Sequence, residues 1–225
     1  MNAQAILRAL QLPNGSTVNS IYLVGSRLWG TETPKSDFDI LVVVEAPSSH
    51  ATLQKSQHKG NYDMTVVTET QFRAQVEAGS LIETVCCLLD PDSDTVLHPV
   101  PEKGAPLNKE RRKLVSLEAM RAWIDERARR DLEKAEKFWV KGSSSRENGW
   151  KILHHSLAAE CIMGGLLSST KTTCALGDLV LTTLQLQEMV ELGWQENDRQ
   201  WLEMEWVNAL EEYHIRMKLV KVSWG

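Results

Sequence analysis

Three short runs of apolar and β-branched residues predict the strands of the N-terminal half of the chain. They cover residues 21–24, 39–44 and 62–67 and are bounded by glycine, proline or polar residues. Runs of this length and composition are typical of strands. Because two of them are apolar almost throughout, the sheet must be covered by helices on at least one face, which predicts an α/β or α+β core.

Weaker signals surround these strands. A leading helix is predicted within residues 2–11, and another helix within residues 70–78. Residues 82–89 are apolar, and the pattern does not decide between helix and strand for so short a run. Residues 90–106 contain four prolines, at 91, 99, 101 and 106. They predict a connecting segment with one short strand near residues 95–97.

A helical pattern dominates the chain after Pro106. Residues 108–141 contain no glycine or proline, and their apolar residues recur at spacings of three and four, which predicts one long amphipathic helix. Its interior stripe is formed by Leu114, Leu117, Met120, Ile124, Ala128, Leu132, Ala135 and Trp139. Further helices are predicted near residues 146–167, 184–192 and 198–220. The C-terminal half is therefore expected to be a helical bundle.

The change from strand-like to helical sequence patterns predicts two domains. We expect an α+β fold, with a small mixed β-sheet flanked by helices in residues 1–104 and an all-helical bundle domain in residues 105–225. The helical domain is expected to close a cleft against the sheet domain.

Composition is that of an ordinary globular protein. Of the 225 residues, 42% are hydrophobic and 24% are charged. No apolar run approaches the ~20 residues of a membrane span, and the N-terminus lacks the basic and apolar segments of a secretory signal. Four cysteines, at 86, 87, 161 and 174, lack zinc-binding spacing. These features predict a cytoplasmic protein with reduced thiols and no membrane partner.

Charge is distributed unevenly along an acidic chain, whose net charge is −5. Residues 103–141 nevertheless contain twelve Lys and Arg against seven Asp and Glu. Within this segment a basic stripe recurs at helical spacing, formed by Arg127, Arg130, Lys134, Lys137 and Lys141. The stripe either binds RNA or another polyanion, or is a solvated helix face steadied by Glu126–Arg130 and Glu133–Lys137 pairs. The acidity of the whole protein favours the solvated face.

The first candidate functional residues are Gly25 and Ser26, where the first predicted strand ends. Gly25 allows close backbone approach, Ser26 supplies a hydroxyl and an N–H, and a helix starting there exposes further N–H donors, which together predict a phosphate seat. Asp37 and Asp39 follow at the start of the next strand. Residues two apart in a strand point to the same face, and neighbouring carboxylates are costly unless a cation neutralises them. Such oxygen ligands suit Mg²⁺.

Asp63 is a third candidate, because it is the one acid in the apolar run 62–67. A buried unpaired carboxylate is expensive, so Asp63 must lie at an edge, be paired, or bind a metal. A strand antiparallel to that of Asp39 would place the two carboxylates side by side. Together with Asp37 they could then hold two metal ions for in-line phosphoryl displacement. Alternatively, Asp63 is a hydrogen-bonded residue on an edge strand, and Asp37 and Asp39 are solvated acids in a turn at the start of their strand.

The chain resembles the DNA polymerase beta-like nucleotidyltransferase superfamily in one sequence signature. The signature consists of Gly25-Ser26, a gap of ten residues, Asp37-x-Asp39 and an aspartate on a later strand. The fuller form, Gly-Ser-Arg-Leu-Trp-Gly-Thr followed by Ser-Asp-Phe-Asp-Ile, is similar to its small stand-alone members, and the likeness covers roughly residues 21–67. The resemblance implies that the N-terminal domain transfers a nucleoside monophosphate from an NTP, with ATP favoured, to an acceptor hydroxyl. It also implies release of pyrophosphate and Mg²⁺ or Mn²⁺ as cofactor.

The same resemblance implies roles for individual residues. The catalytic and metal-binding candidates are Asp37, Asp39 and Asp63, and the nucleotide-binding candidates are Gly25, Ser26, Arg27 and Lys151. Asp63 would hold the metal that activates the acceptor. Lys151 is chosen because related two-domain enzymes use a bundle lysine to grip the triphosphate. As alternatives to nucleotide binding, Arg27 has a surface role and Lys151 is a solvated side chain.

The sequence does not identify the acceptor of the nucleotide. A protein side chain, an RNA 3′ end and a small hydroxylated molecule all fit the chemistry. The alternative to an enzyme is a regulatory module, such as an antitoxin, or an RNA-binding module built on the same fold. Retention of all three carboxylates favours the enzyme. The eight tryptophans, several of them in the helical half, indicate a buried interface and so allow a homo-oligomer.

Overall fold

The computed structural model of the 225-residue chain describes a β-sheet, the helices between its strands and two helices that follow the last strand. The described residues are 6–8, 10, 12, 14–29, 32, 34, 36–45, 55–98, 105–141, 148–149, 152, 155–156 and 159. The chain divides into two compact units, Met1–Met120 and Arg121–Gly225.

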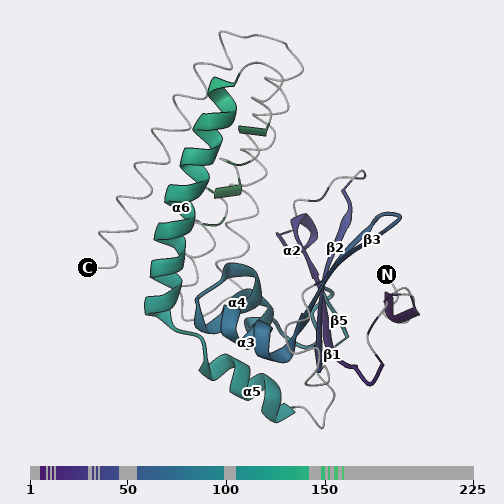
Figure 1. Cartoon of the computed structure of the whole chain (residues 1–225). Coiled ribbons are helices and arrows are strands. Elements are labelled where there is room, and N and C mark those ends of the chain that lie inside the picture. The colour runs from purple at the N-terminus through teal and green to yellow at the C-terminus, as the bar shows by residue number, and fades with distance from the viewer. Residues whose placement is uncertain are drawn as a thin grey trace. The chain divides into compact units, whose positions relative to one another are not determined.

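A five-stranded mixed sheet forms the centre of the first unit (Figure 1). Its strands are β1 (Thr17–Val24), β2 (Phe38–Glu45), β3 (Lys55–Lys59), β4 (Tyr62–Thr68) and β5 (Val96–His98). Their order across the sheet is β3-β4-β2-β1-β5. Strands β2 and β4 are parallel, and the other neighbouring pairs are antiparallel. The mixed sheet with flanking helices confirms the predicted α+β core.

The direction of β4 corrects an expectation from the sequence, which placed the strand of Asp63 antiparallel to that of Asp39. The two strands are parallel, because the chain first forms β3 and reverses at Gly60, whose φ is +61°. Strand β3 then pairs antiparallel with β4 at the outer edge of the sheet. The sequence Lys-Ser-Gln-His-Lys of β3 has no apolar alternation, because the strand lies at an edge, where charged residues are usual. The sequence pattern therefore missed this strand.

Two helices follow β4 directly. Helix α3 (Glu69–Glu77) begins with a capping box, in which the Thr68 hydroxyl accepts from the Gln71 backbone and the Gln71 side chain accepts from the Thr68 backbone. The undecided run 82–89 forms helix α4 (Leu81–Leu88), which buries Leu81, Val85, Cys86 and Cys87. Both cysteines are buried free thiols.

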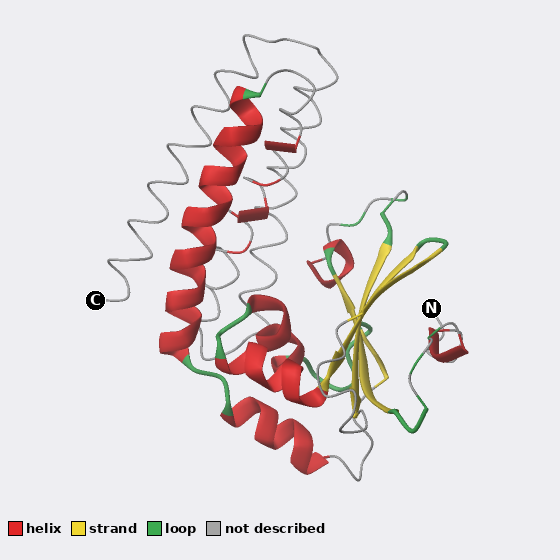
Figure 2. Ribbon diagram, viewed as in Figure 1, coloured by secondary structure: helices red, strands yellow, loops and turns green. Residues whose placement is uncertain are grey.

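The two faces of the sheet are covered differently (Figure 2). One face packs against α3 and α4 through a cluster formed by Tyr22, Leu41, Val43, Val67, Phe72, Val76, Cys86 and Cys87. The other face is covered by the N-terminal helical residues 6–8, in a cluster formed by Ile6, Ile21, Ile40, Val42, Val44, Met64 and Val66. Successive residues of each strand therefore serve opposite cores, which explains why these strands are apolar almost throughout.

The single long helix predicted over residues 108–141 is two helices, α5 (Ala105–Lys113) and α6 (Leu117–Val140). The break lies at Leu114–Ser116, where Leu114 and Val115 pack against the α3/α4 core. The Ser116 hydroxyl accepts from the Ala119 backbone, 3.2 Å away, and so caps α6. Leu117, predicted to be interior, is the first residue of α6 and is 54% exposed. Among the predicted interior residues, Met120, Ile124 and Ala135 are buried.

Helix α5 is fixed to the sheet through the buried side chain of Arg111. Its guanidinium donates to both carboxylate oxygens of Glu69, at 2.9 and 2.5 Å, and to the hydroxyls of Ser20 and Tyr22, at 3.2 and 3.1 Å. It also lies 4.7 Å from the centre of the Phe72 ring. Burial alone would raise the pKa of Glu69, but the hydrogen bonds from Arg111 lower it below its usual value.

These contacts tie α5 to the first unit, whereas the boundary predicted from the sequence, between residues 104 and 105, stays a prediction. Residues 148–149, 152, 155–156 and 159 are helical, within the helix predicted over 146–167. The helices predicted at 184–192 and 198–220 lie outside the described residues. Among the described helices, none has the length and apolar character needed to cross a membrane.

Candidate active site

Asp39 and Asp63 are register partners on the parallel strands β2 and β4. Register partners on neighbouring strands present their side chains to the same face of the sheet. By strand alternation this is the face of Leu41 and Val43, which α3 and α4 cover. The two carboxylates therefore lie at the end of that face, beyond the buried core, and both are half-buried. Asp37 is exposed and directly precedes β2.

Gly25 lies against the Asp39 carboxylate. Strand β1 ends at Val24, the register partner of Asp39, and Gly25 follows with a φ of +65°. A Cβ at this position would lie 2.0 Å from Oδ2 of Asp39, which no real contact allows. Glycine is thus required by both backbone conformation and space. As expected from the sequence, a helix starts immediately afterwards, the short α2 (Ser26–Trp29).

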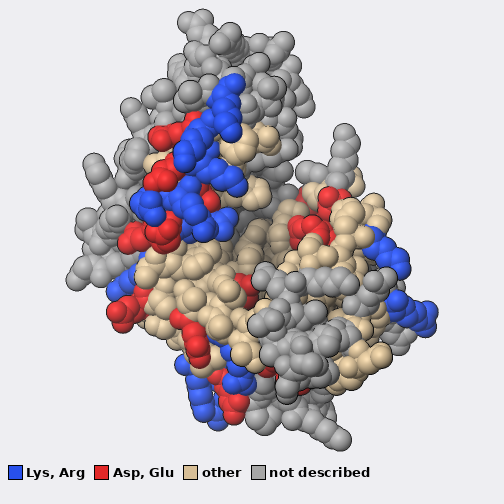
Figure 3. All heavy atoms as spheres, viewed as in Figure 1, with Lys and Arg blue, Asp and Glu red and all other residues tan. Residues whose placement is uncertain are grey.

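The three aspartates form one electrostatic group. The pKa of Asp39 is raised from its ordinary value of 3.8, first by burial and then by the negative charges of Asp63 and Asp37, while Arg27 acts in the opposite direction. Figure 3 shows acidic side chains gathered on the sheet unit. Repulsion of this kind marks a place where a cation would be stabilised.

Arg27 holds the segment that carries Asp37. Its Nε donates to the Asp37 carbonyl at 3.3 Å and its Nη2 to the Ser36 carbonyl at 3.0 Å. The guanidinium also lies 3.8 Å from the centre of the Phe38 ring, a cation–π contact. The Arg27 side chain therefore contacts both the loop before β2 and the first residue of that strand. Its assignment to phosphate binding stays a prediction, and the sequence did not indicate its positioning contacts.

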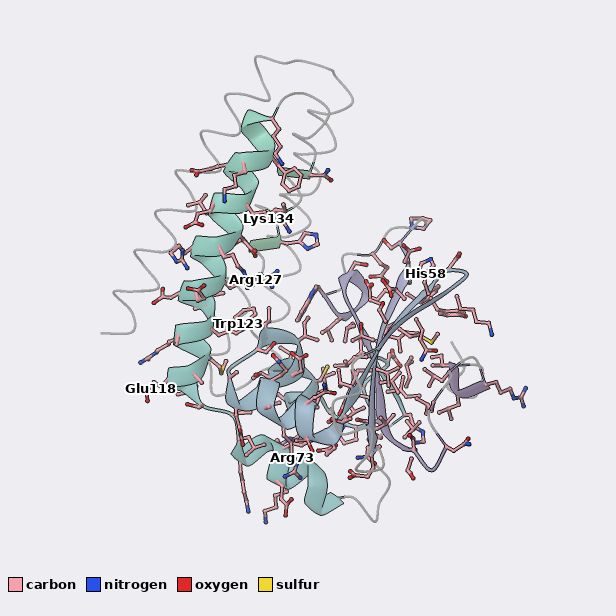
Figure 4. The ribbon with its side chains drawn as sticks, in the orientation of Figure 1. His58, Arg73, Glu118, Trp123, Arg127 and Lys134 are labelled. Carbon is pink, nitrogen blue, oxygen red and sulfur yellow. The ribbon has the colours of Figure 1, made fainter. Side chains whose placement is uncertain are left out.

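Two residues of the edge strand β3 lie beside Asp63. The Ser56 hydroxyl donates to Oδ1 of Asp63 at 3.3 Å, and His58 is the register partner of Asp63. Figure 4 labels His58 on the β3–β4 hairpin. Sequence reasoning missed both residues, because β3 has no apolar pattern and neither residue belongs to a recognised motif. A serine and a histidine two apart in a polar run were the only available signal.

The side chains gathered at this end of the sheet are of the type that hard divalent cations prefer as ligands. Within the described residues, no three His, Cys, Asp or Glu side chains lie close enough to form a ready metal cluster. The three carboxylates still present only oxygen donors, and the pKa of Asp39 is raised first by its burial and then by the charges of Asp63 and Asp37. Carboxylates with this repulsion suit Mg²⁺ or Mn²⁺ and exclude soft, thiolate-binding metals.

Basic side chains gather along α6 (Figure 3), which carries the stripe up to Lys137, and Lys141 directly follows the helix. The ion pairs on α6 differ from those expected. Glu126 and Glu133 both pair with Arg129, and Asp131 pairs with Arg127. The expected Glu126–Arg130 and Glu133–Lys137 salt bridges are absent from the described residues. Figure 4 labels Arg127 and Lys134 on this helix. Lys151 lies outside the residues whose side chains are described.

The family of the chain follows from comparison with known proteins. Residues 4–146 match the family described as "Nucleotidyltransferase domain". The chain therefore belongs to the nucleotidyltransferase domain family, as its resemblance to the polymerase beta-like superfamily indicated, and the family supports nucleotidyl transfer in general.

Solved structures and curated sequences add little to this assignment. The chain is similar to a nucleotidyltransferase-like protein from Exiguobacterium sibiricum 255-15, at 14% identity and a TM-score of 0.30. That match covers 77% of this chain and 70% of the other. No curated protein sequence matches the chain.

Proposed function

We propose that the chain is a metal-dependent nucleotidyltransferase that moves a nucleoside monophosphate from an NTP to an acceptor hydroxyl. The observation that carries this proposal is the register of Asp39 with Asp63, beside a glycine whose missing side chain leaves room for the Asp39 carboxylate. Family membership supports the general reaction. The nucleotide, the metal and the acceptor are parts of the proposal.

The β- and γ-phosphates of the NTP bind at Gly25 and Ser26, where β1 ends and α2 begins. The acceptor oxygen forms a bond to the α-phosphorus, and the bond from that phosphorus to the bridging β-phosphate oxygen breaks. Pyrophosphate leaves with the electron pair of the broken bond. The proton of the acceptor hydroxyl passes to the carboxylate of Asp63, and Arg27 keeps the Asp37 segment in place meanwhile.

Asp37, Asp39 and Asp63 would hold Mg²⁺, with Mn²⁺ as the alternative ion, which when bound neutralises phosphate charge and lowers the pKa of the attacking hydroxyl. We favour ATP as the nucleotide and a cytoplasmic location, the latter because Cys86 and Cys87 are free thiols. The acceptor is a protein side chain, an RNA end or a small hydroxylated molecule. Lys151 is proposed as a further triphosphate ligand.

The deciding experiment measures pyrophosphate release from each of the four α-labelled NTPs with Mg²⁺ or Mn²⁺ and a cell extract that supplies acceptors. Label is counted separately in protein, RNA and small molecules. The wild type should transfer label. The Asp39→Ala variant should fold but neither release pyrophosphate nor transfer label. Glu45→Ala is the matched control, because Glu45 is an exposed acid at the other end of the same strand.

Failure of the wild type to bind any NTP with either metal would contradict the enzyme and favour the regulatory alternative. In that case the carboxylates would serve as a scaffold, and a partner such as the toxin of a toxin–antitoxin pair would be sought.

A second candidate function is RNA binding by α6. Arg130, Lys134 and Lys137 are exposed and form no salt bridge within the described part of the chain, because Arg127 and Arg129 take the neighbouring acids. This arrangement leaves three charges of the stripe for phosphate contacts. Reversing Lys134 and Lys137 to glutamate should weaken binding to a labelled single-stranded RNA and flatten its salt dependence, whereas Asp37→Ala should change neither. Equal binding by the reversed variant would remove this candidate.

A further inference from the structure

One row of register partners crosses four strands of the sheet at the end that carries the aspartates. In spatial order it runs from His58 on β3 to Asp63 on β4, Asp39 on β2 and Val24 on β1. Register partners share a face, so His58 lies on the same face as the two carboxylates. The row therefore has two different ends: Gly25 follows Val24 at one end, and the exposed His58 stands at the other.

The chemistry of in-line displacement gives these two ends different roles. The attacking and leaving oxygens lie on opposite sides of the phosphorus, roughly in line with it. If the β- and γ-phosphates bind at the Gly25 end, the α-phosphorus lies over the carboxylates and the leaving pyrophosphate is on the β1 side. The acceptor must then approach from the opposite side, which is the β3 edge.

Contacts on β3 agree with this direction. The Ser56 hydroxyl, two residues before His58 and on the same face, donates to Oδ1 of Asp63 at 3.3 Å. That bond fixes one oxygen of the carboxylate nearest the edge and leaves Oδ2 for another partner. The His58 side chain has no hydrogen-bond partner within the described residues, and it is exposed. A polar side chain is thus presented beside Asp63 without a structural bond of its own.

We propose that the edge strand β3 forms the acceptor side of the site, with His58 contacting the acceptor and Ser56 positioning the carboxylate of Asp63. This inference rests on the proposed nucleotidyl transfer. The acceptor hydroxyl binds between His58 and Asp63, gives its proton to Asp63, and bonds through oxygen to the α-phosphorus. The bond from that phosphorus to pyrophosphate breaks on the β1 side, and pyrophosphate takes the electron pair. Ser56 does not touch the reacting atoms and is a positioning residue.

The test separates the acceptor side from the nucleotide side. Label transfer from α-labelled ATP is measured against increasing amounts of the cell extract at fixed ATP, and then against ATP at fixed extract. Binding of the non-reacting analogue α,β-methylene-ATP is measured by calorimetry. His58→Ala should raise the half-saturating amount of extract about tenfold, as expected for one lost hydrogen bond. The affinity for the analogue should stay within about twofold of wild type, a change smaller than one such bond.

Lys59→Ala is the matched control, because Lys59 is the exposed neighbour of His58 on the opposite face of the same strand. It should behave as wild type. Ser56→Ala should lower the maximal rate at saturating extract without changing analogue affinity, and Ser56→Thr should restore it, because threonine keeps the hydroxyl. Thermal midpoints of all variants show whether the hairpin is intact.

The outcomes distinguish the inference from the proposed function. An active wild type whose His58→Ala variant is unchanged overturns the inference and leaves the transferase intact. Equal losses in His58→Ala and Lys59→Ala, or a loss of analogue affinity in His58→Ala, also overturn it, because the effect is then not specific to the acceptor. A wild type that releases no pyrophosphate with any acceptor fraction removes the proposed function, and the inference falls with it.

Discussion

Asp39 on β2 and Asp63 on β4 stand directly opposite each other across a parallel strand pair. Burial and then the charges of Asp63 and Asp37 raise the pKa of Asp39 above 3.8. The metal-free protein is therefore destabilised at neutral pH, because the ionised Asp39 carboxylate is half-buried beside two other negative charges. Asp63→Asn should raise the thermal midpoint of metal-free protein by a few degrees and abolish the additional stabilisation by Mg²⁺.

The pH dependence follows from the sign of this shift. A carboxyl whose pKa is raised by folding contributes stability that is present below its unfolded pKa and lost as the pH rises through the folded value. The gain in Asp63→Asn should therefore be small below about pH 3.8, the ordinary pKa of Asp39, and grow above it. Thermal melts in chelator from pH 3 to pH 7 measure this, with Glu45→Gln as control. An equal gain in both variants would contradict the coupling.

Gly25→Ala should remove activity and destabilise the protein more than the same change at Gly60. Both glycines have positive φ, of 65° and 61°, so each substitution costs about 1–2 kcal/mol from the backbone. At Gly60 a Cβ meets nothing within 4 Å, whereas at Gly25 it meets the Asp39 carboxylate. Displacing that carboxylate adds about 1–3 kcal/mol. Urea denaturation of both variants makes the comparison, and equal losses would show that Asp39 moves aside freely.

Arg27→Lys should lower the rate of nucleotidyl transfer while retaining nucleotide affinity. Lysine keeps the charge but cannot donate to the Ser36 and Asp37 carbonyls together or stack flat on Phe38. We expect a loss of about tenfold in kcat, the effect of one hydrogen bond. Steady-state rates and calorimetric binding of α,β-methylene-ATP separate the two effects. A loss of affinity with unchanged kcat would instead assign Arg27 to the triphosphate.

Arg111→Met should be among the most destabilising single changes in the first unit. It leaves the buried Glu69 without its main partner, and breaking a buried pair costs about 3–5 kcal/mol. The double change Arg111→Met with Glu69→Leu should recover much of this loss, because no unpaired charge is then buried. Urea denaturation at pH 7 measures all three proteins.

The matched control for Arg111 is Arg129→Ala. Arg129 pairs with Glu126 and Glu133 at the exposed surface of α6, where solvent screens such pairs and they contribute little to stability. The lowered pKa of Glu69 adds a pH signature: its stabilisation is present above pH 4.5 and is lost as the pH falls through the lowered folded value. The double variant should lack this acid-dependent loss.

The sequence predicted those parts of the fold whose residues face a core. Strands β1, β2 and β4 were found because their side chains serve the two hydrophobic clusters. Strand β3 was missed because an edge strand needs no apolar residues, and with it the parallel direction of β4 was missed. The break before α6 was missed because Leu114 keeps the helical spacing while it packs, with Val115, on another core. The cap formed by Ser116 is not marked by the apolar pattern.

In the candidate site, too, the sequence predicted the residues that are close along the chain and missed the contacts that depend on the fold. The spacing of Gly25, Asp37 and Asp39 is local, so the sequence could place these residues near one another. The contact of Ser56 with Asp63 and the row that ends at His58 depend on a hairpin without a recognised motif. The family resemblance assigned Arg27 to nucleotide binding, whereas its contacts in the structure are with two backbone carbonyls and a ring.

The attachment of α5 has a practical consequence for dissecting the protein. An isolated catalytic fragment ended after residue 104 would lose Arg111 and leave Glu69, Ser20 and Tyr22 facing an empty position in the interior. It would also lose the bonds from Arg112 to the carbonyls of Cys87 and Leu89, which close the end of α4. A fragment that continues through Met120, the end of the first compact unit, keeps them all and is a sensible choice for expression, spectroscopy or crystallisation.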